Sequence, residues 1–204
     1  MFLTQDIILK FFFSKKKIIK NGFSIPNNSS VILAPTHRSR WAGLVLTMAM
    51  GRRVTQKDCR FMVTRSEMRG IQGWVLKRLG CFSINQLSPS LSALRYAIQL
   101  IEKGEQLVVF PEGKINRYGK ELTLKEGLYR LARLATKKTQ SVFILPIGIA
   151  YSKVSPNFRG KFCLSFGKPI AIEDYINMNI NEFNKFLYEK MIKEEEKALK
   201  NVGR

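Results

Sequence analysis

The alternation of strand-like and helix-like segments is the feature of this sequence that most restricts its fold. Six runs rich in Val, Ile and Phe are bounded by turn residues, as buried strands are. They are Val31–Pro35, Arg60–Thr64, Cys81–Ile84, Gln106–Phe110, Val142–Ala150 and Lys161–Phe166. Five other segments carry apolar residues at helical spacing. They are Trp41–Met50, Ser66–Leu79, Ser90–Glu102, Lys125–Thr136 and Ile180–Lys200. This alternation predicts a layered α/β domain.

The last two predicted strands indicate that the sheet is mixed. "VFILPIGIAY" and "GKFCLSF" are separated by a short turn that contains Ser-Pro-Asn-Phe-Arg-Gly, which favours an antiparallel pair. We therefore expect a single α/β domain with a mixed, mostly parallel sheet flanked by helices. Pro146 interrupts the first of these strands, and this predicts an edge position, a strand end or a bulge. The final helix pairs Glu with Lys at i, i+4 spacing and is expected to present a solvated face.

Length, charge and cysteine content narrow the class of protein. A chain of 204 residues is long enough to bury a core without metals or disulfides. Its three cysteines are far apart and form no CxxC pair, and with a single histidine no metal site is expected. The formal net charge of +20 favours polyanionic partners, which are nucleic acid or an anionic membrane surface, or it is simply solvated lysine.

The N-terminal residues 1–22 stand apart from residues 23–204, which form the predicted catalytic domain. An apolar stretch, Ile7–Phe13, is followed by Lys15, Lys16, Lys17 and Lys20. This pattern is typical of a helix lying in a membrane interface, and equally of a packed helix with a charged tail. The sequence shows neither a convincing signal peptide nor an apolar run of bilayer-spanning length. The expected location is therefore peripheral, on the cytoplasmic face of a membrane.

Three short stretches follow strand ends, where α/β folds place their sites. The first is His37 with its neighbours Arg38 and Ser39. The second is Phe110–Gly113 within "VVFPEGKINR", and the third is Pro146 within "ILPIGIA". Imidazole, with an ordinary pKa of ~6.5, is suited to act as a general base. Each stretch alone is a weak signal, and a lone histidine after a strand is more often structural.

In their order and spacing these stretches resemble the glycerolipid acyltransferases, the family of the lysophosphatidate acyltransferases. The first motif of that family is His, four intervening residues and Asp. It matches at His37, but Ala42 stands at the Asp position. The third motif, Phe-Pro-Glu-Gly, is complete at Phe110–Gly113, and the fourth, Pro in an apolar strand, matches at Pro146. The resemblance covers about residues 30 to 170.

The second family motif is matched in part. It combines a Gly, an Ile and an Arg soon after, and this chain has Gly80 and Ile84 but Gln86 at the place of the arginine. Arg117 lies slightly beyond the arginine position of the third motif. The difference at Gln86 leaves the head group of the acceptor open.

The resemblance implies transfer of a fatty acyl group from a thioester, either acyl-carrier-protein or coenzyme A, to the sn-2 hydroxyl of a lysophospholipid. The acceptor would be 1-acylglycerol 3-phosphate and the product phosphatidate, with no cofactor. His37 would be the base, and Glu112 would orient acceptor hydroxyls. Cationic side chains and backbone N–H groups near the site would hold the phosphate or the oxyanion. Candidates for these roles are Arg38, Arg40, Lys114 and Arg117, with the N–H groups near Gly113 and Ser39.

Ala42 predicts impaired catalysis, because an alanine can neither orient an imidazole nor balance its charge. Replacing the Asp of a serine-protease triad by Asn lowers kcat by ~10⁴. Either the residue was changed from Asp, or the chain is a natural variant that uses another carboxylate or none. A non-catalytic lipid-binding relative is therefore an alternative function.

Two other classes are weighed on the residues alone. A nucleic-acid-binding module rests on charge only, because no nucleic-acid-binding motif is found, and no nucleic-acid partner is expected. The α/β hydrolase class is not favoured, because its G-x-S-x-G motif does not occur in this sequence.

Overall fold

A single eight-stranded mixed sheet forms the centre of the molecule. The computed structural model describes residues 2–20, 29–85, 88–139 and 141–204. The strands are β1 (Phe13–Lys20), β2 (Ser30–Pro35), β3 (Cys59–Thr64), β4 (Cys81–Ile84), β5 (Gln106–Val108), β6 (Val142–Tyr151), β7 (Gly160–Phe166) and β8 (Ile170–Ala171). Their order is β1-β7-β6-β2-β5-β3-β4, with β8 beside β6. Only the β6–β7 and β6–β8 pairings are antiparallel among the described strands, which confirms the mixed α/β fold.

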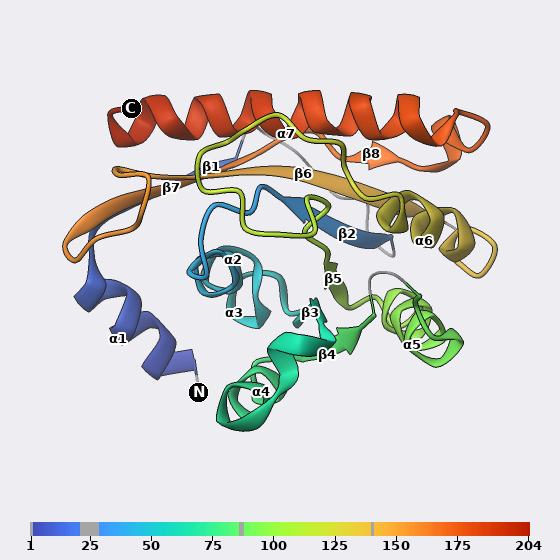
Figure 1. Ribbon diagram of the computed structural model, residues 1–204, viewed down its shortest axis with the longest axis horizontal. Helices are drawn as coiled ribbons and strands as arrows, with labels where there is room; N and C mark the ends of the chain where they lie inside the picture. Colours follow the sequence, from blue (N-terminus) through green and yellow to red (C-terminus); the bar gives the residue numbers. More distant parts are fainter. Residues whose placement is uncertain (1, 21–28, 86–87, 140) are drawn as a thin grey trace.

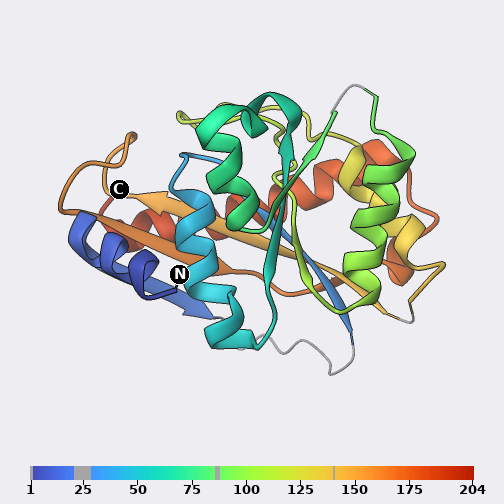
Figure 2. The same ribbon diagram turned by 90° about the horizontal axis from the view of Figure 1, so that it is seen from below.

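Helices cover both faces of this sheet. They are α1 (Phe2–Phe12), α2 (Ala42–Met50), α3 (Arg52–Thr55), α4 (Gly70–Arg78), α5 (Leu91–Glu102), α6 (Gly127–Ala135) and α7 (Ile180–Val202). Helix α7 runs along one face, and α1, α2 and α4 lie on the opposite side, which Figure 2 views directly (Figures 1 and 2). Two large apolar clusters follow this division: one packs α1 and α2 against the sheet, and the other packs α5, α6 and α7 against it.

Strand β2 delivers the first motif to its place. All six of its residues are buried, as expected for a central parallel strand covered on both faces. Beyond its last residue, the N–H of Thr36 donates to the carbonyl of Ile147 at 2.9 Å. The Thr36 hydroxyl accepts from the N–H of Ile149, also at 2.9 Å. These bonds hold the chain where it leaves the sheet, immediately before His37.

The lysine-rich segment is a strand, which corrects the expectation that it belongs to a membrane-surface helix. Residues 13–20 pair in parallel with β7 at the end of the sheet, so this part of the N-terminal segment belongs to the same sheet as the strands that follow. Phe13 is buried in β1, whereas the lysines are exposed. Lysines on an edge strand discourage pairing with another chain, and this is a structural explanation for the lysine cluster of β1.

Helix α1 is packed on one side and apolar on the other. Leu9 is buried, and the ring of Phe12 stacks on Trp41 with centroids 4.2 Å apart. Ile7, Ile8 and Phe11 remain 59%, 48% and 70% exposed. The helix thus combines the two expected arrangements, because it is anchored in the core and keeps an apolar face in solvent.

The segment Ser66–Leu79, predicted as one helix, is divided. A 3-10 turn spans Arg65–Met68 and α4 begins at Gly70. Gly70 has a φ of 55°, a left-handed conformation that glycine adopts without a steric penalty. The chain therefore changes direction here, between the 3-10 turn and α4.

Pro146 lies inside β6, neither at an edge nor at a strand end. It pairs with Ala34 of β2, while the opposite side of β6 changes neighbour from β8 to β7 between Ile144 and Ile147. The Pro146 carbonyl accepts from the N–H of Gly167 on that side. Since the N–H and C=O of one strand residue point the same way, the missing N–H falls where no strand is paired.

None of the helices in the described ranges combines the length and the apolar content that a bilayer span requires.

Candidate active site

A cavity of about 620 Å³ opens on the α2 side of the sheet, between α2, β3, α4 and the segment that follows β5. Apolar side chains make up much of its wall, and they include Leu44, Phe61, Val63, Leu76, Leu79 and Phe110. The imidazole of His37 lies in the same wall, with Arg40 and Lys114. An apolar space with a few convergent polar groups is the usual form of a ligand site.

His37 is held by the third motif. Its ring stacks on Phe110 with centroids 4.0 Å apart and an interplanar angle of 24°. Its backbone N–H donates to Glu112 Oε1 at 2.8 Å, and its carbonyl accepts from the N–H of Asn116 at 2.8 Å. Two motifs separated by more than seventy residues are therefore one structural unit. The stacking on Phe110, which orients the ring, is not evident from the sequence.

The Nδ1 atom of His37 is buried and has no hydrogen-bond partner among the described residues. Ala42, the first residue of α2, is fully buried, and the first turn of α2 holds no acid. Burial, followed by the positive charge of Arg38, lowers the pKa of His37 to about 4. The imidazole is thus neutral at pH 7, and within the described part of the chain no carboxylate accepts from Nδ1 to select its tautomer or support its protonated form.

The stability of the protein should report this lowered pKa. In the unfolded chain His37 binds a proton near pH 6.5, whereas the folded protein resists protonation until about pH 4. The contribution of neutral His37 to the free energy of unfolding is complete above pH 6.5 and is lost as the pH falls toward 4. Between these values the free energy of unfolding should fall by about 1.4 kcal/mol per pH unit. Urea titrations of this chain and of His37→Gln from pH 7 to pH 5 test this. Parallel pH dependences in the two proteins would contradict it.

Arg38 is buried between two carboxylates, which differs from its expected role as a phosphate ligand. Its Nη1 donates to both oxygens of Glu112 at 2.9 and 2.7 Å, and its Nε and Nη2 donate to Glu195 at 2.5 and 2.6 Å. Burial alone would lower the pKa of Arg38, but the two carboxylates outweigh it and raise the pKa. The guanidinium is therefore engaged within the protein.

Glu112 is also placed differently from expectation. It is 2% exposed and is not part of the cavity wall. Its oxygens accept from the Arg38 guanidinium and from the N–H of His37. In this arrangement Glu112 positions the His37 backbone and does not line the cavity.

The partner of Arg38 on α7 is not predicted by the sequence pattern, which indicates a solvated helix face. Glu194 and Glu195 are only 5% and 7% exposed. Glu194 accepts from the Ser165 hydroxyl at 2.5 Å, so both carboxylates have partners in the fold. A signal was present, because these two residues fall on the buried stripe of α7 that contains Met191 and Ala198.

Gly113 and Ser39, whose surroundings are expected to bind an anion, both have hydrogen-bond partners within the protein. The N–H of Gly113 donates to the Phe110 carbonyl at 3.0 Å, in a turn where Gly113 has a φ of 68°. Ser39 is buried, and its hydroxyl accepts from the N–H of Trp41 at 3.2 Å. This bond closes a turn immediately before α2, whose N-cap is Trp41. The Gly113 N–H and the Ser39 hydroxyl oxygen are therefore engaged within the protein.

The cationic candidates divide between two cavities. Arg40 and Lys114 are exposed and line the His37 cavity. Arg117 lines a separate cavity of about 220 Å³ beside α7, with Arg204 and Tyr188. The structure therefore brings Lys114, but not Arg117, together with His37.

The two matched residues of the second motif have structural positions. Gly80 has a φ of 85°, and a Cβ there would lie 2.9 Å from the carbonyl oxygen of Cys59. Its own carbonyl accepts from the N–H of Phe61 at 3.2 Å, which ties the turn to β3. Ile84 is buried at the end of β4. Gln86 lies outside the described residues.

Cys81 lines the cavity as well, so a thiol acceptor of acyl groups has to be considered. Burial raises the pKa of Cys81 to about 12. The thiolate is the nucleophilic form, and at pH 7 almost none is present. Cys81 therefore contributes to the cavity as an apolar side chain.

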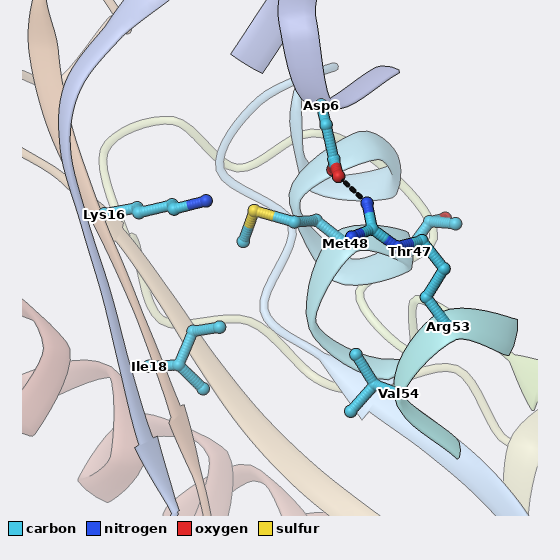
Figure 3. Close-up of a pocket in the computed structure, with 7 residues that line it drawn as sticks. All are labelled: Asp6, Lys16, Ile18, Thr47, Met48, Arg53 and Val54. Atoms are coloured by element: carbon cyan, nitrogen blue, oxygen red, sulfur yellow. Dashed lines mark hydrogen bonds and ion pairs between the residues drawn. The ribbon is translucent and has the colours of Figure 1, made fainter. Parts of the chain in front are cut away.

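A third cavity, of about 360 Å³, adjoins the His37 cavity across α2. It is lined by residues of α1, β1, α2 and α3, and Thr47 belongs to both cavities. In Figure 3 Asp6 of α1 forms an ion pair with Arg53 of α3, and Lys16 of β1 lies across the space. The ion pair and the aromatic contacts of Phe12 thus attach α1 at two points.

Comparisons with known proteins agree with this architecture. Over 164 residues the chain is 29% identical to the 1-acyl-sn-glycerol-3-phosphate acyltransferase of Streptococcus pneumoniae (strain ATCC BAA-255 / R6), covering 78% of this chain and 57% of that protein. The match thus spans little more than half of the relative's length.

The fold is similar to a crystal structure of the 1-acyl-sn-glycerophosphate (LPA) acyltransferase PlsC from Thermotoga maritima. The TM-score is 0.69 at 18% identity, and the match covers 100% of this chain and 78% of the other. The family model named Acyltransferase matches residues 17–150, which is more than half of the chain and includes every motif described above. This chain therefore belongs to the acyltransferase family.

Proposed function

We propose that this protein is a lysophospholipid O-acyltransferase of the 1-acylglycerol-3-phosphate type, which works at a membrane surface and is catalytically impaired by Ala42. The observation that carries the proposal is the position of His37 in the wall of a large apolar cavity, with Arg40 and Lys114 beside it. Fatty acyl chains fit such a wall, and a phosphate group fits such cations. The Streptococcus relative is a 1-acyl-sn-glycerol-3-phosphate acyltransferase, which supports the same acceptor.

The chemistry follows from the placement of the imidazole. Since Nδ1 is buried, Nε2 is the nitrogen left for the acceptor hydroxyl. As the hydroxyl oxygen attacks the thioester carbonyl carbon, its proton passes to Nε2. The carbon–sulfur bond then breaks, and the thiolate takes the proton from the imidazolium. A carboxylate at position 42 would accept from Nδ1–H and stabilise that imidazolium, and this is the step that Ala42 weakens. The reaction needs no cofactor.

The donor thioester is carried by coenzyme A or by an acyl carrier protein. Both carriers are anionic, and the net charge of +20 suits either. The same charge, with the exposed apolar face of α1, supports peripheral binding to anionic lipid on the cytoplasmic side of a membrane. The exposed residues of that face are Ile7, Ile8 and Phe11.

The phosphate subsite is tested by binding, which does not depend on turnover. Lys114→Met and Arg40→Met should each raise the Kd for lysophosphatidate about tenfold, because each removes a charge-assisted contact. Calorimetry below the critical micelle concentration measures this, with monoacylglycerol as the ligand that lacks phosphate. Binding of monoacylglycerol should not change.

Arg117→Met is the matched control, since this exposed cation lines the other cavity. It should leave the Kd for lysophosphatidate unchanged. A loss of affinity in Arg117→Met, with none in Lys114→Met and Arg40→Met, would move the acceptor site to the α7 side and contradict the proposal.

A further inference from the structure

Helix α4 presents an apolar face to solvent. Ile71, Trp74 and Val75 are 84%, 58% and 42% exposed. They occur at i, i+3 and i+4, so they share one side of the helix. A helix of a soluble domain normally turns such a stripe toward the core. Three large apolar side chains gathered on one exposed face mark a surface that meets another apolar phase.

Cations surround this face. Arg69, Lys77 and Arg78 are exposed, and the nine residues of α4 include no acid. The Arg78 guanidinium lies 4.2 Å from the centroid of the Trp74 ring. Tryptophan flanked by arginine and lysine is the composition of helices at a membrane–water boundary, where the ring sits among the headgroups and the cations face anionic lipid.

The same helix forms part of the cavity wall. Gln72 and Leu76 of α4 line the cavity of His37, as does Leu79 directly after the helix, and they lie on the side of α4 next to the exposed stripe. A lipid or protein surface that contacts Ile71 and Trp74 therefore lies next to the side of α4 that lines the cavity. Helix α1, with its own exposed apolar residues, is on the same side of the sheet as α4 (Figures 1 and 2).

We propose that the exposed face of α4 inserts into the interface of an anionic lipid bilayer and places the rim of the cavity at the depth of the lipid headgroups. A lysolipid could then enter the cavity without crossing water. That consequence rests on the proposed function, but the insertion itself does not. Lipid fits better than an acidic carrier protein, because the centre of the face is Ile71 and Trp74 and its cations lie around the rim.

Fluorescence with vesicles tests the insertion. The vesicles contain equal amounts of phosphatidylglycerol and phosphatidylcholine, with bromine on the acyl chains of the latter. Binding should shift the Trp74 emission to shorter wavelength and quench it. Trp74→Phe, an exposed and conservative change, should still bind but should lose most of the quenching, because the remaining Trp41 is packed against Phe12.

The contribution of the face is measured by sedimentation with the same vesicles. The triple variant Ile71→Ser, Trp74→Ser, Val75→Ser should lower the partition coefficient about tenfold or more. Leu91→Ser is the matched control: Leu91 is 71% exposed on α5, which packs with the helices of the opposite face, and the change should have no effect.

Three results would overturn the proposal. One is vesicle binding without quenching of Trp74. Another is undiminished binding of the triple variant. The third is an emission shift with an acidic acyl carrier protein but not with vesicles, which would assign α4 to a protein partner. Failure of the proposed function gives a different set of results. The Ala42→Asp variant would then not transfer acyl groups even to detergent-dispersed lysophosphatidate, while vesicle binding through α4 would persist.

Discussion

Ala42→Asp is expected to raise acyl transfer to lysophosphatidate by about a thousandfold or more. The substitution gives the orphaned Nδ1 of His37 an acceptor and provides a negative charge beside the imidazolium that forms during transfer. The start of α2 also favours a carboxylate at its first residue, through the helix dipole. Initial rates with a labelled acyl thioester and lipid vesicles measure the gain. The acidic limb of the pH–rate profile should move upward from about pH 4, because the carboxylate raises the pKa of His37.

Ala42→Asn is the matched control, since it has the shape of Asp without its charge. An amide can present either a donor or an acceptor to Nδ1, and it does not stabilise an imidazolium. Its rate should stay close to that of the unchanged chain. If the Asp variant folds, binds lysophosphatidate and transfers no faster than the Asn variant, His37 is not the base.

Arg38→Met is expected to lower the free energy of unfolding by about 3–5 kcal/mol. Without the guanidinium, Glu112 and Glu195 remain buried with their main cation gone. Burial raises the pKa of Glu195, and removing Arg38 would raise it further. The loss should therefore shrink as the pH falls, because a protonated carboxyl carries no buried charge. Chemical denaturation at pH 7 and at pH 5 measures both effects.

Two variants separate this network from surface ion pairs. Arg52→Met removes the exposed pair with Asp58, which lies at 2.7 Å, and should cost less than about 1 kcal/mol. Combining Arg38→Met with Glu112→Gln and Glu195→Met removes the buried charges together and should recover much of the lost stability. A small effect of Arg38→Met, no larger than that of Arg52→Met, would mean that water reaches the network.

The positions of the strands and helices were largely predictable because they depend on local periodicity. The expected strand Cys81–Ile84 is observed with the same bounds, and the buried run of β2 differs by one residue. The exceptions have tertiary or conformational causes. Phe13–Lys20 shows no apolar alternation beyond its first residue, and it becomes a strand only because β7 offers a partner. The break before α4 depends on the left-handed conformation of Gly70.

The members of the site were predictable in part, but several of their roles were not. His37 and Lys114 do line one cavity. Arg38 and Glu112 belong to a buried pair, and which cation of the first motif turns inward is decided by Glu195, a residue of the last helix. The spacing of the residues around His37 does not predict a contact with α7. The ring of Phe110 was included in the third motif for its position, and only the fold shows that it stacks on the imidazole.

The sequence by itself determined the α/β class, the order of the motifs and the absence of an acid at position 42, because these are properties of residue identity and short-range pattern. Only the tertiary structure decided which of the charged groups are buried together and which face the cavity. The reason is that burial of a charge depends on partners far away in the chain: Arg38 and Glu195 lie 157 residues apart and still form one ion pair.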